Sequence, residues 1–236
     1  SPQAFTRLCD SVWQTRPDYG YGRPWELPFV DRVFLLVLHL RTNLTERQLA
    51  VFFDVGDATV HRVISTYTPH LAALLPSAVD ADRRHLYVVD GTLIPAHDRS
   101  KTALCKNYRR SVNVQVVARR TDRRIVAVSD PAPGNRNDVR VWKESDLPEQ
   151  TAGMRLIGEG GYRGAPGVVS PRRGAGERIV RDDDFRRFRR KRATAEHVLA
   201  RFKDWAPMRQ CRRRGDNVGL TVRACAALYN LSDAVR

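Results

Sequence analysis

The feature that most constrains the fold is a short apolar run that ends in a carboxylate. Leu86, Tyr87, Val88 and Val89 are followed directly by Asp90. A run of this length, bounded by polar residues, predicts a buried β-strand. We expect Asp90 to end that strand, where a carboxylate can stay ionised without the full cost of burial. An Asp-Gly pair is also common in plain turns, so a functional role for Asp90 depends on acids elsewhere in the chain.

The charge balance indicates a polyanionic partner. The 236 residues include 41 Lys and Arg against 26 Asp and Glu, a formal net charge of +15. Most of the excess is arginine, whose guanidinium group forks onto phosphate. Nucleic acid is the obvious polyanion, although an acidic membrane surface would attract the same charge. No apolar run approaches the roughly 20 residues that cross a bilayer, and no secretory signal opens the sequence, so we expect no membrane partner.

The cysteines do not form a recognisable framework. Four of them are scattered along the chain, and no pair has CxxC spacing: Cys9, Cys105, Cys211 and Cys225. We expect free thiols in a reducing compartment and neither a disulfide frame nor a zinc site.

The first third of the chain predicts an all-helical domain, residues 1–80. A short helix and an irregular arm are expected over residues 1–28, followed by a helix over 29–40. Thr45 and Gln48 then form a capping box, which starts a helix that runs to about Phe53. Residues 54–57 form a tight turn, and its last residue, Asp57, can cap a second helix.

The second helix has one apolar and one polar face. The apolar face consists of Val60, Val63, Ile64, Tyr67 and Leu71. Thr59, His61 and Arg62 lie on the other face, free to contact a ligand. Two short helices joined by a glycine-containing turn predict a helix-turn-helix at residues 45–72, whose second helix enters the major groove of DNA. An ordinary helical hairpin is the alternative, and the net charge favours DNA binding.

A linker over residues 75–84 leads to a second domain, residues 84–236. Strands are expected at 86–90, 112–116 and 124–129, the last two paired antiparallel. A loop over 131–137 precedes a helix that opens at Asp138, followed by strands at 154–158 and 168–170 and a long helix that contains Arg192 and Glu196. This order predicts an α/β fold with a mixed sheet flanked by helices, of the ribonuclease H-like type.

Three carboxylates have settings that suit a metal site. Asp90 ends a strand, Asp138 opens a helix, and Glu196 lies beside the apolar stripe of the long helix. Magnesium prefers carboxylate oxygens, and two such ions stabilise the attacking and leaving oxygens of a phosphodiester. Each acid also has a structural explanation, because Asp138 can serve as an N-cap and Glu196 can pair with Arg192.

Four motifs around these acids resemble those of a known protein family. The segments 89–95 and 107–115, the segment 133–138 and the spacing Arg192-x3-Glu196-x6-Lys203 resemble DDE transposases. The similar group is the bacterial insertion-sequence type related to the PIF/Harbinger elements. At two places the sequence departs from that family, with Arg189 where a tyrosine is usual and Glu159 where an aspartate is common.

The resemblance implies a function and its parts. Asp90, Asp138 and Glu196 would be catalytic and hold two Mg²⁺ ions, which Mn²⁺ could replace. Arg189, Arg192 and Lys203 would contact DNA beside the acids. The partners would be double-stranded DNA, namely terminal inverted repeats and target DNA, and a second copy of the chain when two ends are brought together. We expect a protein of the bacterial cytoplasm, associated with the nucleoid.

Two questions stay open at the level of sequence. The chain could cut and join DNA, bind DNA without cutting as a domesticated relative, or hydrolyse DNA as a ribonuclease H-like endonuclease without joining. The third acid could also be Glu159, which follows an apolar strand. We favour Glu196, because a helix holds a ligand more stiffly than the Gly-Gly turn after Glu159.

Overall fold

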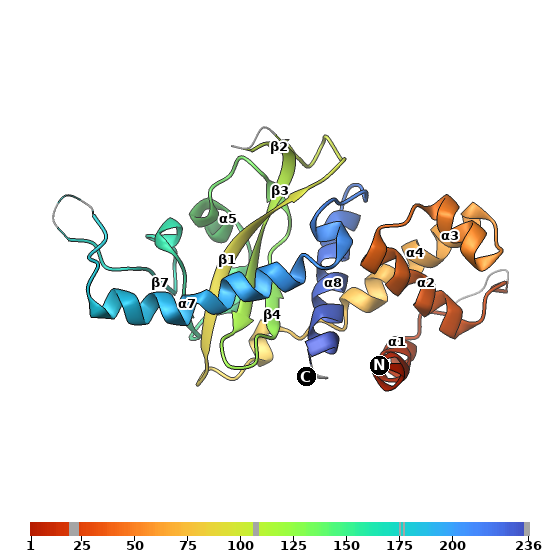
Figure 1. Ribbon diagram of the computed structural model, residues 1–236, viewed down its shortest axis with the longest axis horizontal. Coiled ribbons are helices and arrows are strands. Elements are labelled where there is room, and N and C mark those ends of the chain that lie inside the picture. Colours follow the sequence, from red (N-terminus) through yellow and green to blue (C-terminus); the bar gives the residue numbers. More distant parts are fainter. Residues whose placement is uncertain (19–23, 106–108, 175, 177, 234–236) are drawn as a thin grey trace.

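The computed structural model describes residues 1–18, 24–105, 109–174, 176 and 178–233. Four helices come first: α1 (Pro2–Gln14), α2 (Phe29–Thr42), α3 (Glu46–Phe53) and α4 (Asp57–Ala72). They lie at one end of the molecule, and a sheet flanked by further helices forms the rest (Figure 1). The predicted α/β class with a helical N-terminal part is confirmed.

The local signals of the helix-turn-helix are confirmed, with one exception. Gln48 N donates to Thr45 Oγ1 over 3.2 Å, and Thr45 N donates to Gln48 Oε1 over 2.9 Å, which completes the capping box. The expected cap of α4 is wrong, because Gly56 and not Asp57 occupies the N-cap position. Asp57 is the first helical residue, where its charge favours the positive end of the helix dipole.

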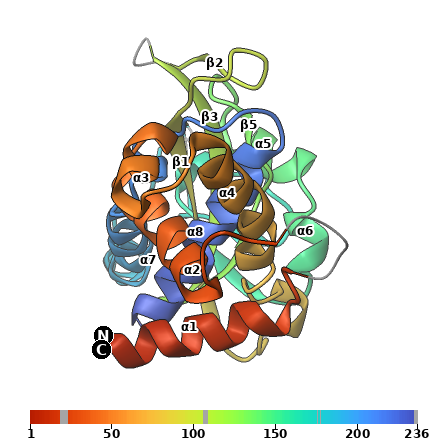
Figure 2. The ribbon, with the colours of Figure 1, turned by 90° about the vertical axis from the view of Figure 1, so that its right-hand side faces the viewer.

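The apolar face of α4 is buried as predicted, and it packs along α8 (Asn217–Asp233). Figure 2 shows α8 running behind the N-terminal helices. Val63 and Tyr67 of α4 belong to the same buried cluster as Val222 of α8 and Val88 of the sheet. The helix-turn-helix is therefore anchored to the sheet through α8. The division into domains of residues 1–80 and 84–236 stays a prediction. Between α4 and β1 the chain forms the short 3-10 turn η1 (Ala78–Asp80).

The sheet has seven strands, three of which are only two residues long. The long pair is β1 (Leu86–Pro95) and β3 (Arg110–Arg119), which run antiparallel. β6 (Arg155–Ile157) pairs with β1 in parallel, and β7 (Val168–Val169) pairs with β6. β3 also pairs with three shorter strands: β2 (Ala103–Leu104), β4 (Ile125–Val128) and β5 (Ala132–Pro133). The expected antiparallel pairing of the strands at 112–116 and 124–129 is confirmed.

The first strand is longer than expected. β1 does not end at Asp90 but continues to Pro95, because β3 pairs with it as far as Ser111. The parallel partner β6 stays with β1 only from Leu86 to Val88. Asp90 therefore lies in the middle of a strand, just past the point where one neighbour leaves.

Helices cover both faces of the sheet. Alternate residues of β1 face opposite sides. Val88 and Ile94 join the cluster with α8 and α7 (Asp183–Phe202), whereas Tyr87 and Val89 join a second cluster. That second cluster is built around the helices α5 (Asp138–Glu144) and α6 (Leu147–Gln150).

Three further expectations concern the whole chain. None of the described helices is long and apolar enough to cross a bilayer. The cysteines are buried thiols, as expected: Cys9, Cys105, Cys211 and Cys225. Residues 19–23 of the expected arm and residues 107–108 of the second motif lie outside the described residues.

One side chain ties α8 to the sheet. Asn230 is buried, its Oδ1 accepts from Ile125 N and its Nδ2 donates to Ile125 O, both over 2.8 Å. Asn230→Ala leaves two buried backbone groups without partners, so we expect a loss of about 2–4 kcal/mol in the free energy of unfolding. Urea unfolding measures this loss. Ser232→Ala on the same helix removes an exposed hydroxyl and is the control. A loss below that of the control would contradict the anchoring role.

Candidate active site

Asp90 is a buried carboxylate. Its side chain is 14% exposed, and its Oδ1 accepts a hydrogen bond from Gly91 N over 3.0 Å. Burial raises the pKa of Asp90 to about 6, Arg192 opposes this rise, and Glu159 and Asp138 add to it. The expectation that Asp90 escapes the cost of burial is therefore wrong, because β1 continues past Asp90 to Pro95 and the side chain is mostly shielded from solvent.

Asp138 begins α5 without capping it. The N-cap is Asn137, whose Oδ1 accepts from Arg140 N over 3.0 Å. The purely structural explanation of Asp138 as an N-cap is thereby removed. Its Oδ1 instead accepts from Asn113 Nδ2 over 3.0 Å and from Gln115 Nε2 over 3.1 Å. Two neighbouring residues of β3 thus orient the carboxylate.

The two amides are themselves held in place. Tyr162 donates its hydroxyl hydrogen to Gln115 Oε1, so the Nε2 group of Gln115 must face Asp138. Gln115 Nε2 also donates to Asn113 Oδ1 over 3.1 Å. The roles of Asn113, Gln115 and Tyr162 were missed at the level of sequence. The available signal was that two amides interrupt a buried strand, where unpaired polar groups are costly.

Gly91 allows Asp138 to approach β1. A methyl group at Gly91 would overlap Asp138 Oδ1 and would lie 2.9 Å from Gln115 Nε2. Any side chain here would push Asp138 away from the strand. The Asp-Gly pair is therefore explained by a close approach of another element and not by a turn, since Gly91 is within β1.

Asp90 and Asp138 line one cleft of about 450 Å³ together with Glu159. Glu159 comes two residues after β6 and is 46% exposed at its side chain. A Cβ placed on Gly161 would lie 3.5 Å from Glu159 Oε1 and 3.7 Å from Asp138 Oδ2, so these two oxygens flank the same glycine. The structure thus brings three carboxylates to the place where β1 and β6 part.

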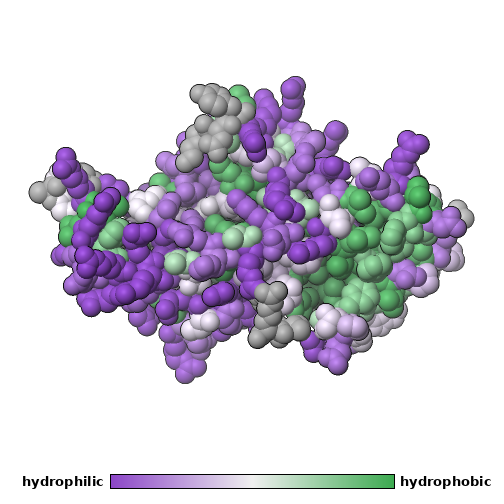
Figure 3. All heavy atoms as spheres, in the orientation of Figure 1, coloured by the Kyte–Doolittle hydropathy of each residue, from purple (hydrophilic) through white to green (hydrophobic). Residues whose placement is uncertain are grey.

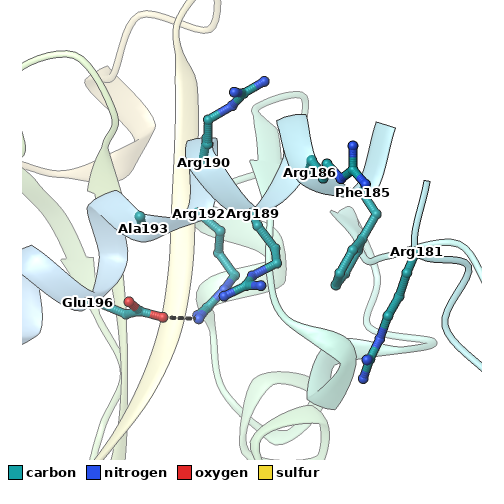
Figure 4. Close-up of a pocket in the computed structure, with 8 residues that line it drawn as sticks. All are labelled: Arg181, Phe185, Arg186, Arg189, Arg190, Arg192, Ala193 and Glu196. Atoms are coloured by element: carbon teal, nitrogen blue, oxygen red, sulfur yellow. Dashed lines mark hydrogen bonds and ion pairs between the residues drawn. The ribbon is translucent and has the colours of Figure 1, made fainter. Parts of the chain in front are cut away.

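Glu196 lies on the other side of Arg192. Its side chain is 64% exposed and lines a second pocket, whose walls are mostly arginine (Figure 4). Arg192 donates through Nη2 to Glu196 and through Nη1 to Asp90 Oδ2, the latter over 3.2 Å. The same Nη1 lies 3.9 Å from Glu159 Oε2. The structure therefore connects Glu196 to the cleft through a guanidinium and does not bring it into the cleft.

The donor set suits a hard divalent cation in chemistry and in charge. Carboxylate oxygens are the ligands that Mg²⁺ prefers. The pKa of Asp90 is raised mainly by burial, and the charges of Glu159 and Asp138 add to the rise. Within the described residues, however, no three acidic, histidine or cysteine side chains converge closely enough to form a ready-made site. Arg192 supplies the positive charge between them.

The expected base-reading face of α4 is partly engaged within the chain. Thr59 Oγ1 donates to Glu26 Oε2 over 3.3 Å, and His61 Nδ1 lies 3.2 Å from both Glu46 oxygens. The Arg62 guanidinium stacks on the Trp25 ring, 4.3 Å from its centroid. These contacts place Arg62 at the base of the arm that precedes α2.

The other expected DNA contacts have different surroundings. Arg189 is exposed and lines the arginine pocket with Glu196. Arg192 is bound to carboxylates, as described above. Lys203 is the C-cap residue of α7, at the end of the helix away from that pocket.

The pKa of Asp90 predicts how the stability of the metal-free protein depends on pH. The folded-state pKa of about 6 lies above the ordinary value of 3.8, so the folded chain binds this proton more tightly than the unfolded chain does. Stability therefore falls as pH rises between these two values. We expect Asp90→Asn to raise the unfolding free energy by on the order of 2–3 kcal/mol at about pH 7.5, and little at about pH 4. Denaturant unfolding with a chelator present measures both.

Asp98 provides a control of opposite sign. Hydrogen bonds from Gly215 N and Ser100 hold the pKa of Asp98 at about 2, below its ordinary value. Asp98→Asn should therefore lose more stability at neutral pH than at low pH. A gain for Asp90→Asn that does not change with pH would contradict the assignment of the raised pKa to burial of the Asp90 carboxylate.

Comparisons with known proteins identify the family of the chain. The pattern of the DDE superfamily endonucleases matches residues 89–230, and the helix-turn-helix of the same superfamily matches residues 25–77. A transposase assigned to insertion sequence element IS112, from Streptomyces albus G, is 37% identical over 236 residues, which cover 98% of this chain and 91% of that protein. The finer relation to PIF/Harbinger elements stays a prediction. The chain belongs to the DDE superfamily of endonucleases, and its first helices are the helix-turn-helix of that superfamily.

Proposed function

We propose that this chain is a transposase that binds the ends of a mobile DNA element, cleaves phosphodiesters there and joins the freed 3′-hydroxyl ends to target DNA. The observation that carries the proposal is the cleft in which Asp90, Asp138 and Glu159 meet beside Arg192. The relationship to the IS112 transposase supports the same role. The superfamily generally uses divalent metal ions, and we propose two Mg²⁺ ions, replaceable by Mn²⁺.

In this proposal Asp90, Asp138 and Glu196 would hold the ions. The bound ions would stabilise the charge on the attacking and leaving oxygens of the phosphodiester. The residues around the acids prepare them for this task. Asn113 and Gln115 occupy Asp138 Oδ1, which leaves Oδ2 available on the side of Glu159. Glu196 can reach the cleft only after Arg192 releases it.

The chemistry requires no covalent bond to the protein. In the first step the oxygen of water bonds to phosphorus, and the 3′-oxygen leaves and takes up a proton. In the second step that 3′-hydroxyl attacks a phosphodiester of target DNA, loses its proton and displaces a new 3′-oxygen. The chain must therefore hold two DNA segments at one cleft, and the excess of arginine suits this demand.

The helices of residues 1–80 would recognise the terminal inverted repeats, with Thr59, His61 and Arg62 on the face of α4 that enters the groove. Arg189, Arg192 and Lys203 would contact phosphates near the acids. Joining two ends calls for two copies of the chain, so we propose a homodimer in the synapsed state. The same role would place the protein on the bacterial nucleoid in the cytoplasm.

The identity of the third acid can be tested with two isosteric variants. We expect Glu196→Gln to abolish Mg²⁺-dependent cleavage of a labelled end, because it removes a ligand charge while keeping shape. Glu159→Gln should retain measurable cleavage. Binding of Mn²⁺, followed by calorimetry, should weaken at least tenfold in Glu196→Gln and less in Glu159→Gln.

Each variant also needs a DNA-binding control, which should be unchanged. Loss of cleavage in Glu159→Gln with retention in Glu196→Gln would reverse the assignment. Cleavage without joined products in the wild-type chain would identify a nuclease that does not transpose, and binding without cleavage would identify a domesticated DNA-binding protein.

Substitution of Arg62 tests whether α4 contacts base edges in the major groove of DNA. Its guanidinium stacks on Trp25, which holds it at the surface of α4. If it reads a base edge, Arg62→Ala should weaken binding of the full chain to the terminal repeat by about 1–3 kcal/mol and leave binding to random DNA nearly unchanged. Trp25→Leu removes the ring on which Arg62 stacks, and because Trp25 also contacts Tyr67 and Arg32, its thermal unfolding is compared with that of the wild type. Equal weakening on all sequences would limit Arg62 to a phosphate contact.

A further inference from the structure

The second pocket is a strongly basic concave surface. It has a volume of about 650 Å³ and is lined by residues of α7 and the segment before it: Arg181, Phe185, Arg186, Arg189, Arg190, Arg192, Ala193 and Glu196. Five of these eight are arginine. A guanidinium group can donate two parallel hydrogen bonds to two oxygens of one phosphate. The lining therefore predicts a phosphodiester ligand.

The arginines of this region differ in whether a carboxylate of the chain is paired with them. Arg186 is paired with Asp183, and outside the pocket Arg187 is paired with Asp184. Arg192 is committed to the acids of the cleft. Among the described residues no carboxylate pairs with Arg181, Arg189 or Arg190, and all three are exposed. These three charges are therefore available to neutralise a ligand.

The arrangement of the side chains defines one binding face. Phe185 lies between Arg181 and Arg189, and the three side chains extend to the same side of α7 as Glu196, whereas Arg190 extends the other way (Figure 4). Phe185 is only partly buried. A partly exposed aromatic ring between two guanidinium groups can contact sugar or base while the arginines contact the flanking phosphates.

The pocket is placed on the far side of the acids from the helix-turn-helix. In Figure 1 the N-terminal part of α7 extends to one end of the molecule, α3 and α4 lie at the opposite end, and β1 with Asp90 lies between them. Arg192 lines the pocket and also pairs with Asp90 of the acidic cleft, so the pocket and the cleft are adjacent. Figure 3 shows hydrophilic side chains over α7 and apolar ones over α2 and α3, where Phe34, Val51 and Phe52 are exposed.

We propose that this pocket binds the DNA backbone beyond the scissile phosphodiester, on the side away from the terminal repeat that the helix-turn-helix holds. The inference rests on the proposed function, since it assumes that an element end crosses the cleft. Two sources supply the same backbone chemistry. Flanking donor DNA extends there before cleavage, and target DNA enters there afterwards.

The test compares two double variants of the full chain on two duplexes. Arg181→Gln with Arg189→Gln removes two available charges from the pocket. Arg84→Gln with Arg187→Gln removes the same charge from exposed arginines that are paired with Asp82 and Asp184. One duplex carries the terminal inverted repeat that borders the coding region and ends at the scissile position. The other continues for about one helical turn of flanking DNA. Binding is titrated against salt, with a chelator present.

On the duplex with flanking DNA, the pocket variant should lose about 1.8 from the magnitude of the slope of log K against log salt, since each lost phosphate contact removes about 0.9. On the duplex without flank, and for the control variant on either duplex, the slope should stay at the wild-type value. An equal loss on both duplexes, or an equal loss in the control variant, would overturn the proposal.

Target DNA is tested in a second arm. The complex with the pre-cut end is mixed with labelled target duplex, and target capture is measured without metal. Reduced capture only in the pocket variant assigns the target as a ligand of the pocket. Unchanged slopes on flanked DNA together with unchanged capture would overturn the proposal. Neither arm requires cleavage. A catalytically inactive wild type would therefore contradict the proposed function, and DNA binding by the pocket could still be measured.

Discussion

The site depends on the point at which strand β6 stops pairing with strand β1. β3 pairs with β1 along its whole length, whereas β6 follows β1 only as far as Val88. Past that point one edge of β1 faces a cleft instead of a strand. Ligands commonly bind where the carboxyl ends of parallel strands open a crevice in an α/β sheet. Asp90 on β1 and Glu159 after β6 are both near the ends of this opening, and α5 brings Asp138 against Gly91.

Bringing acids together in a partly dry cleft costs free energy, and the structure balances this cost in two ways. Asp138 receives two amide donors from β3, which stabilise its charge without adding a cation. Asp90 has only one backbone donor and depends on Arg192 for compensation. Arg192 is thus the one cation shared by Asp90, Glu159 and Glu196 within the described residues. A phosphate bound at Arg192 would compete with these acids for the same guanidinium group.

The fold was largely predictable because its signals are local. The capping box at Thr45, the apolar face of α4 and the alternation along β3 each depend on near neighbours in sequence. The helix caps were less predictable, because Gly56 and Asn137 compete with adjacent aspartates for the same position. The end of β1 could not be predicted, since pairing with β3 and not the residues themselves carries the strand through Gly91 to Pro95.

The cleft was predictable in part, because the sequence singled out Asp90 and Asp138, which line it, and favoured Glu196, which does not. Motif spacing singled out Asp90, Asp138 and Glu196, but spacing carries no information on which pocket a side chain enters. Glu196 follows Arg192 by one helical turn and is therefore held by it. Asn113 and Gln115 were visible only as polar interruptions of an apolar strand. Their role required the position of Asp138, which a contact between β3 and α5 determines.

The packing of α4 on α8 gives the chain a mechanical property that the motifs do not suggest. α8 contacts α4 on one side, and on the other it is tied to β4 by Asn230 and packs against α7. A single buried cluster extends from Tyr67 of α4 through Val222 of α8 to Val198 of α7, the helix that bears Arg192 and Glu196. Close-packed interiors transmit displacement with little compression. Under the proposed function, DNA bound at α4 would therefore lie at a distance from the acids that this packing sets, and the cleavage position would not depend on a flexible linker.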